Sequence, residues 1–111
     1  GPFSITGQPN AMGGREVGGL STQLAAHMHY EQQGATEIVE SFWQAPNIAK
    51  TQGLKAVDLF DAVDAGKIKV IWIMATNPVV SLPDADLVKR ALEKCPTVIV
   101  SECFEGSDTL A

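Results

Sequence analysis

The chain has 111 residues, of which 45% are hydrophobic and 19% charged, and its formal net charge at pH 7 is −5. This length suits one domain at most, and no run approaches the roughly 20 apolar residues that cross a membrane. The net negative charge and the lack of a lysine or arginine cluster argue against binding along a nucleic-acid backbone. Binding of a compact nucleotide by backbone amides is still possible. We therefore expect a soluble protein with no nucleic-acid partner and no membrane partner.

Glycine dominates the start of the chain, where residues 1–19 hold six of the ten glycines. Glycine and proline at this density predict a long loop rather than a helix or a long strand. Loops of this length are usually either functional or disordered, so an active loop and a flexible arm with Arg15 and Glu16 in solvent both stay open.

Residues 20–54 read as a helical region that ends in a linker. Leu20, Leu24 and Met28 recur every four residues and predict a helix over 20–30. A short helix with Thr36 as its N-cap follows, in which Phe42 and Trp43 are expected to act as packing anchors. Breaker residues over 44–54 then predict the linker.

Residues 55–74 predict an amphipathic helix followed by a strand. Val57, Phe60 and Val63 share one face of the helix, and Gly66 suits its left-handed C-cap. The run VIWIM at 70–74 is apolar throughout, as in a strand of a parallel sheet covered on both faces. Pro78 ends this region because it cannot donate a ladder hydrogen bond.

The rest of the chain predicts a helix and a second strand parallel to the first. Ser81 is the expected N-cap of the helix, along which Asp86 and Arg90 are spaced to pair. Residues 97–100 then form the next strand. Residues 70–101 therefore predict one βαβ unit, with both strands ending at the same edge of the sheet.

Polar residues follow both predicted strands at this edge. Thr76 and Asn77 follow the first strand, and Ser101 and Glu102 end the second. Open α/β sheets bind ligands at the carboxyl ends of their strands, and a carboxylate matches the paired N–H donors of guanine. A nucleotide crevice is one interpretation, and an Asx-turn at Asn77 with a solvated Glu102 is the other.

Two long segments, TGQPNAMGGREVGG and IMATNPVVSLPDAD, together with ESFW and VIVSECFEGSDT, resemble the molybdopterin-guanine-dinucleotide oxidoreductases, most closely the assimilatory nitrate reductases. The resemblance covers essentially the whole chain. It implies an α/β fold, a Rossmann-like parallel βαβ sheet fragment with a long Gly-rich N-terminal loop. Residues 1–111 would be part of one dinucleotide-binding domain, with an active-site loop at 1–19, a helical and linker region at 20–54, and a helix plus the βαβ unit at 55–111.

The same resemblance implies roles for six residues. Arg15 is similar to an arginine near the metal that orients an anion such as nitrate, and Gln8 to the glutamine of the same loop. The dinucleotide-binding positions would be Thr76, Asn77, Ser101 and Glu102. Glu102 departs from the aspartate usual in the family, because it is one methylene longer.

The implied activity is reduction of nitrate to nitrite by oxygen-atom transfer at Mo-bis(molybdopterin guanine dinucleotide), in the cytoplasm and for nitrogen assimilation. Cys95 and Cys103 match neither the molybdenum thiolate nor the cysteines of the 4Fe-4S cluster, so no metal ligand is expected within the chain. We therefore expect an internal fragment, inactive alone, whose partners are nitrate, the remaining domains and an electron donor such as ferredoxin, flavodoxin or an NADH-linked subunit. A formate dehydrogenase-type domain and a non-catalytic nucleotide-binding or scaffold module are the alternatives.

Overall fold

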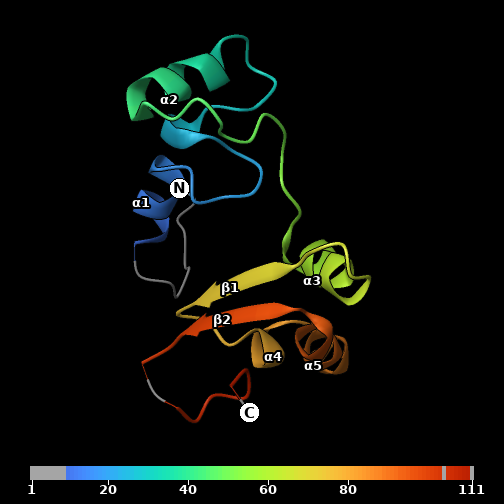
Figure 1. Ribbon diagram of the computed structural model, residues 1–111. Helices are drawn as coiled ribbons and strands as arrows, with labels where there is room; N and C mark the ends of the chain where they lie inside the picture. The colour runs from blue at the N-terminus through green and yellow to red at the C-terminus, as the bar shows by residue number, and fades with distance from the viewer. Residues whose placement is uncertain (1–9, 104, 111) are drawn as a thin grey trace. The chain divides into compact units, whose positions relative to one another are not determined.

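The computed structural model describes residues 10–103 and 105–110. The chain divides into two compact units, residues 1–54 and 55–111, here called unit 1 and unit 2 (Figure 1). The division falls at the end of the linker predicted over 44–54. No helix or strand lies between Trp43 and Ala56. The assignment of both units to one domain of a larger protein stays a prediction.

Unit 1 contains the helix α1 (Ala11–Glu16), the 3₁₀ helix η1 (Ala25–His27) and the helix α2 (Ala35–Trp43). The prediction of a loop throughout residues 1–19 was wrong at α1. Asn10 adopts the left-handed conformation and its side chain accepts a hydrogen bond from the Gly13 N–H at 3.2 Å, which caps the helix. Ala11, Met12 and Arg15 favour helix strongly enough to offset the adjacent Gly13 and Gly14.

The helix predicted over 20–30 was also wrong. Leu20 pairs with Gln23 in an isolated bridge, and Ala26 and His27 have positive φ values of 55° and 59°. Leu24 is buried and Leu20 exposed, so the four-residue spacing does not mark one common face.

Helix α2 forms where predicted but packs differently. Its N-cap is Gly34 instead of Thr36, and its buried residues are Ala35 and Val39. Phe42 is 84% exposed and Trp43 47% exposed, so the expectation that this pair anchors the core was wrong within the described residues.

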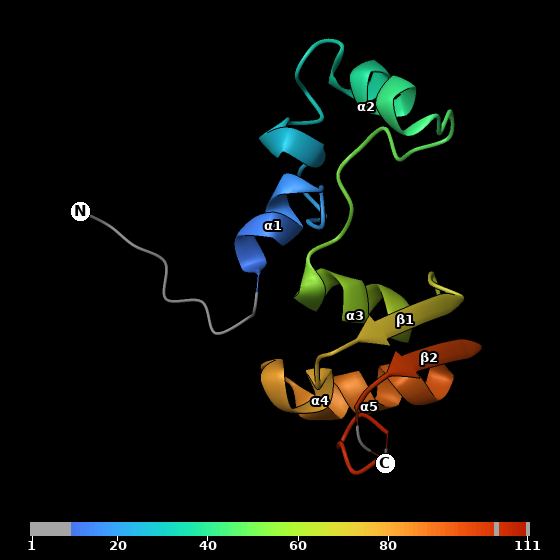
Figure 2. The ribbon, with the colours of Figure 1, turned by 90° about the vertical axis from the view of Figure 1, so that its left-hand side faces the viewer.

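Unit 2 contains α3 (Ala56–Asp64), β1 (Val70–Met74), α4 (Pro78–Ser81), α5 (Ala85–Lys94) and β2 (Thr97–Ser101). The strands are parallel and in register from Val70 opposite Thr97 to Met74 opposite Ser101, which confirms the βαβ prediction. Both arrows point the same way in Figure 2. The left-handed Gly66 after α3 is also confirmed, with φ of 71°.

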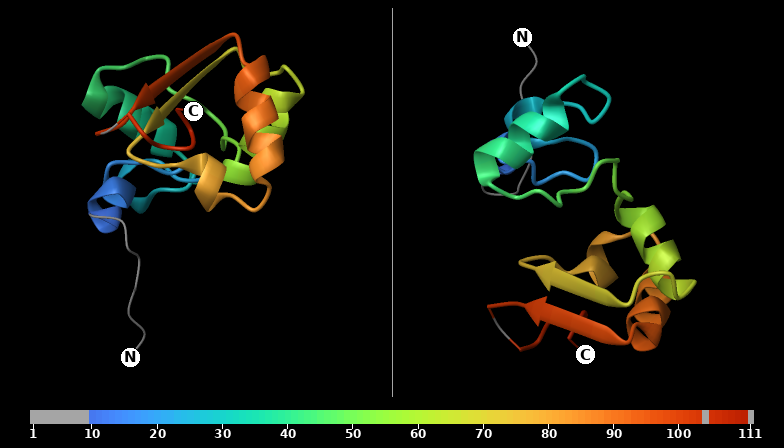
Figure 3. Two further views of the ribbon diagram at one scale, coloured as in Figure 1. Left: turned by 90° about the horizontal axis from the view of Figure 1, so that it is seen from below. Right: turned by 45° about the horizontal axis from the view of Figure 1, so that its top comes forward.

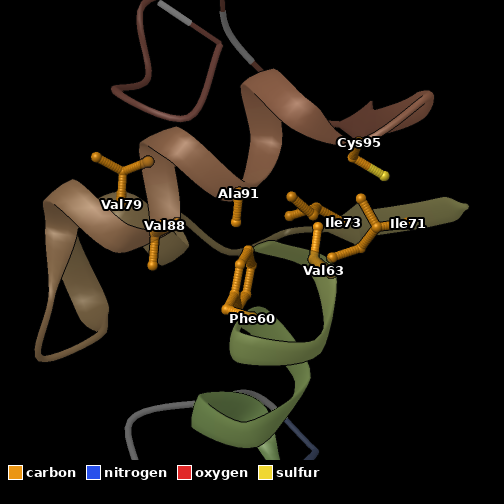
Figure 4. Packing of buried hydrophobic residues seen from close by; sticks show 8 residues of the cluster. All are labelled: Phe60, Val63, Ile71, Ile73, Val79, Val88, Ala91 and Cys95. Carbon is orange, nitrogen blue, oxygen red and sulfur yellow. The ribbon is translucent and has the colours of Figure 1, made fainter. Parts of the chain in front are cut away.

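The core of unit 2 lies between one face of the sheet and the helices. Ile71 and Ile73 of β1 face α3 and α5, which lie on the same side of the sheet (Figure 3). Figure 4 shows the buried cluster, which consists of Phe60, Val63, Ile71, Ile73, Val79, Val88, Ala91 and Cys95. Val70, Trp72 and Met74 alternate with these residues and are exposed, so the prediction that β1 is covered on both faces was wrong for the described residues.

Two polar predictions for α5 were wrong, one about its N-cap and one about an ion pair along the helix. Asp84, and not Ser81, is the N-cap, because its Oδ1 accepts a hydrogen bond from the Leu87 N–H at 2.9 Å. Ser81 instead ends the short α4, which Pro78 begins. Arg90 does not pair along its own helix with Asp86, since its Nε lies 3.2 Å from Asp64 Oδ1 on α3.

Asp64 joins α3 to α5 through two cations. Lys94 Nζ lies 2.7 Å from the same Oδ1 atom, and its hydrogen bond holds the pKa of the Asp64 carboxyl below its ordinary value, with Arg90 adding to the effect and partial burial opposing it. Because the folded-state pKa is depressed, this carboxylate stabilises the fold above its unfolded-state pKa. The stabilisation is lost as pH falls through the folded-state pKa.

We expect Asp64→Asn to lower the thermal unfolding midpoint at neutral pH, with a deficit that disappears in acid. Circular dichroism melts from pH 2 to 7 would measure the difference between this variant and the unchanged chain. Asp58→Asn, an exposed position on the same helix, is the matched control and should differ little. A deficit that grows as the solution is acidified would contradict this account of the pair.

Candidate functional site

The carboxyl ends of the two strands meet at one edge of unit 2. Met74 is the register partner of Ser101, and the Ala75 N–H donates to the Ser101 carbonyl at 3.0 Å. Thr76 and Asn77 therefore leave β1 beside the point where Ser101 and Glu102 leave β2. The structure brings these four sequence-predicted residues to one edge, which here is called the polar edge.

Asn77 is held by two residues that the sequence reasoning missed. Its Nδ2 donates to Asp108 Oδ2 at 3.2 Å, and its Oδ1 accepts from the Thr109 hydroxyl at 2.6 Å. Thr109 Oγ1 in turn accepts from the Val79 N–H at 3.5 Å. The segment after β2 thus folds back and fixes the orientation of the Asn77 amide.

Ser107 adds an unusual group to this returning segment. The residue is 4% exposed, and its hydroxyl has no hydrogen-bond partner among the described residues. A buried hydroxyl without a partner costs about 1–3 kcal/mol. The only sequence signal was the polar run GSDT at 106–109, placed after a strand that ends at the polar edge.

Ser101 and Glu102 make contacts of their own. The Ser101 hydroxyl accepts from the Trp72 indole N–H at 2.9 Å. Glu102 Oε1 accepts from the Cys103 N–H at 2.9 Å. None of the hydrogen bonds among residues 10–103 and 105–110 joins Asn77 to either of them.

Thr76 lies at a groove of about 380 Å³ in unit 2. The groove is formed by α3, β1 and α4 and is lined by Ala56, Leu59, Phe60, Ile71, Trp72, Ile73, Met74, Thr76, Pro78, Ser81 and Leu82. Its lining is mostly apolar, so Thr76 supplies one of its few hydroxyl groups.

In unit 1, Arg15 is exposed in the last turn of α1, and the ion pairs found among the described residues do not involve it. Its carbonyl accepts from the Gly18 N–H at 3.1 Å, and the Gly14 carbonyl accepts from the Gly19 N–H at 2.7 Å. These bonds close the helix end and fix the backbone from which the guanidinium extends. Gln8, the second residue assigned to this loop, lies outside the described residues.

Replacement of Gly18 should disturb the C-terminal end of α1. Its φ is 78°, and a Cβ there would lie 2.8 Å from the Ala25 backbone nitrogen. The left-handed conformation alone costs a residue with a side chain about 1–2 kcal/mol. We expect Gly18→Ala to accelerate amide exchange across residues 13–19. Gly14→Ala is the matched control, because a Cβ there meets nothing within 4 Å, and equal exchange in the two variants would contradict the prediction.

The described ranges hold no group of three or more His, Cys, Asp or Glu residues placed to bind a metal ion. Nor does any helix there reach the length and apolar character needed to cross a membrane.

Residues 4–111 match the family model described as molybdopterin oxidoreductase, and the chain belongs to this family. Among curated relatives, it is 55% identical over 109 residues to a nitrate reductase of Klebsiella oxytoca, a match covering 98% of this chain and 12% of the relative. A nitrate reductase of Shewanella frigidimarina is 58% identical over 107 residues, which cover 96% of this chain and 11% of that protein. A periplasmic nitrate reductase of Desulfovibrio desulfuricans is 38% identical over 112 residues, or 97% of this chain and 15% of the relative.

The chain therefore spans only 11% to 15% of the length of these relatives. The family itself implies a molybdenum-pterin cofactor in the complete enzyme.

Proposed function

We propose that this chain is a segment of a molybdenum-dependent nitrate reductase, which reduces nitrate to nitrite by oxygen-atom transfer at Mo-bis(molybdopterin guanine dinucleotide). The observation that carries the proposal is the identity of 55% and 58% to two nitrate reductases over nearly the whole chain. The bound cofactor supplies the redox chemistry. This chain supplies groups that hold part of the cofactor and steer the anion.

The polar edge is the proposed site for one guanine dinucleotide, within a Rossmann-like sheet that the rest of the parent protein extends. Two features of the residues fit such a group. Ser107 has a buried hydroxyl without a hydrogen-bond partner among residues 10–103 and 105–110, and the edge combines carboxylate, amide and hydroxyl groups. A dinucleotide offers both the phosphate acceptors and the base donors that this set requires.

Glu102 is the proposed partner of the guanine base. Its Oε1 is already oriented by the Cys103 N–H, and each carboxylate oxygen accepts more than one hydrogen bond. The two parallel donors of guanine match the two carboxylate oxygens, which makes the contact charge-assisted. Asn77, fixed by Asp108 and Thr109, is proposed to bind the ribose or diphosphate through the amide proton that Asp108 leaves unused, with Ser101 and Thr76 beside it.

Arg15 is proposed to attract and orient nitrate, together with Gln8. A guanidinium keeps its charge at all working pH values and offers several donors in one plane, which suits a planar oxyanion. The exposed position of Arg15 on a closed helix end supports this role, because the side chain is available to a ligand.

The remaining parts of the proposal concern the parent protein. We propose that the 4Fe-4S cluster and the molybdenum ligand are bound outside this chain. Electrons would arrive from ferredoxin, flavodoxin or an NADH-linked subunit, for nitrate assimilation in the cytoplasm. The periplasmic relative is the more distant of the three, at 38% identity. Assaying the full-length parent with nitrate and with formate tests the activity, and reduction of nitrate without oxidation of formate is expected.

We expect Asn77→Ala and Glu102→Ala each to weaken guanine nucleotide binding by about 10- to 100-fold, since a hydrogen bond to a charged group contributes about 1.5–3 kcal/mol. Titration with GDP can be followed by the fluorescence of Trp72, whose indole contacts Ser101 at the polar edge. Asp58→Asn on α3 is the control and should bind as the unchanged protein does. Saturable binding that survives both substitutions would overturn the assignment of the polar edge.

A further inference from the structure

Asn77 and Asp108 present a hydrogen-bond donor and an acceptor side by side at the polar edge. The Asn77 Nδ2 atom donates one of its two protons to Asp108 Oδ2 at 3.2 Å. Its second proton and the Asp108 Oδ1 atom take part in none of the hydrogen bonds found among residues 10–103 and 105–110. Asp108 is exposed and Asn77 is half-buried, so both groups are open to a ligand.

Thr109 fixes which end of the Asn77 amide faces Asp108. Its hydroxyl donates to Asn77 Oδ1 at 2.6 Å and accepts from the N–H of the buried Val79 at 3.5 Å. A carboxylate only accepts hydrogen bonds, so the amide must turn Nδ2 toward Asp108 and Oδ1 toward Thr109. A ligand at this corner therefore meets an N–H donor from Asn77 next to a carboxylate acceptor from Asp108.

The negative charge of Asp108 has no close cation to compensate it. The ion pairs found within the described ranges all lie elsewhere. Asp108 lines a groove of about 290 Å³ together with Lys89 and Glu93 of α5, so two carboxylates face one ammonium group there. Phosphate is bound by cations and N–H groups, and a like charge beside it is unfavourable. This corner of the polar edge is therefore poorly suited to a diphosphate.

A pair of neighbouring hydroxyl groups suits the same corner well. Each hydroxyl both donates and accepts, so one can donate to Asp108 Oδ1 while the other accepts from the Asn77 N–H. Carboxylates bind ribose hydroxyls in other dinucleotide-binding α/β folds. We propose that Asp108 binds the ribose hydroxyls of the guanine dinucleotide, with Asn77 completing the ribose site. This inference rests on the dinucleotide site proposed above, and it assigns the ribose, and not the diphosphate, to Asn77.

Nucleotide binding to the full-length parent protein, prepared without its cofactor, tests the assignment. Isothermal titration calorimetry compares GDP with 2′,3′-dideoxy-GDP, which lacks both ribose hydroxyls. We expect Asp108→Asn to weaken GDP binding by about 10- to 100-fold, the usual loss for a hydrogen bond to a charged group. Binding of the dideoxy nucleotide should not change, because it never makes the lost contact. Glu105→Gln removes an exposed carboxylate from the same segment and is the matched control, which should alter neither affinity.

Three results would overturn the ribose site while the dinucleotide site stands. An equal loss for both nucleotides in Asp108→Asn would show that Asp108 only orients Asn77. Tighter binding of GDP would show that a phosphate group lies against the carboxylate, and an unchanged affinity would show that Asp108 makes no contact. In each case, weaker GDP binding by Glu102→Ala would still support guanine at the polar edge. If Glu102→Ala also leaves GDP binding unchanged, both proposals fail.

Discussion

Replacing Arg15 by alanine in the full-length parent enzyme should lower kcat/KM for nitrate by about 10- to 100-fold, mainly through a higher KM. The reason is the loss of charge-assisted hydrogen bonds to nitrate. These bonds contribute about 1.5–3 kcal/mol and also orient the anion. Steady-state kinetics with varied nitrate measures the effect. Because α1 is closed by Asn10 at its start and by Gly18 at its end, truncation of the Arg15 side chain should leave the helix in place.

Arg15→Lys separates charge from geometry. Lysine keeps the positive charge but presents a point charge instead of a planar fork, so the loss should be intermediate. Lys55→Ala, which removes an exposed cation preceding α3, is the control for general electrostatic attraction. Unchanged KM and kcat in the Arg15→Ala enzyme would contradict the proposed role of Arg15 in nitrate binding. This conclusion would hold whatever the nucleotide-binding experiment shows for the polar edge.

Phe60→Ala should be the most destabilising single change in unit 2, at about 3–5 kcal/mol. Phe60 is 5% exposed and packs among Val63 and Val88, which are 0% and 1% exposed (Figure 4). Small domains have only about 5–15 kcal/mol of stability in all, so the variant should unfold at much lower denaturant concentration. Fluorescence-detected urea unfolding in a Trp43→Phe background reports unit 2 through Trp72.

The matched control for this change is Val57→Ala on the same helix. Val57 is 51% exposed, so removing its methyl groups creates no cavity and should cost well under the amount expected for Phe60. Equal losses in the two variants would show that the cluster around Phe60 is not the main source of stability of unit 2.

The sequence predicted unit 2 well where a local pattern determines the structure. The apolar run at 70–74 and the strand at 97–100 are placed correctly, as is the left-handed Gly66, because each depends on residues close in the chain. The exposure of one face of β1 could not be predicted. A wholly apolar strand indicates that both of its faces are buried, but it does not indicate whether residues of this chain cover them.

Unit 1 was predicted less well, because competing local signals had to be weighed. In α1 the side-chain cap of Asn10 and good helix formers prevail over two glycines. At residues 20–30 the apolar spacing was helical, but positive φ values at Ala26 and His27 break the pattern. Nothing in the spacing indicated these two backbone conformations.

At the polar edge, sequence reasoning placed Asn77 and Glu102 on one border because parallel topology requires it. It missed Asp108 and Thr109, which are 31 and 32 positions from Asn77 along the chain. A contact of this range depends on how the segment after β2 turns back, and no periodic pattern records that path. Whether the six assigned residues bind cofactor or nitrate stays a prediction, tested by the substitutions above.

The return of the segment after β2 also determines how this region tolerates cleavage. A protease that nicks the backbone between Glu102 and Ser107 would sever the covalent link to Asp108 and Thr109, while both strands and α5 stayed intact. The Asn77 side chain would then lose its hydrogen bonds to Asp108 and Thr109 and could rotate. A truncated form of the chain that ends at β2 should therefore keep its sheet and helices, while the Asn77 side-chain amide loses its fixed orientation.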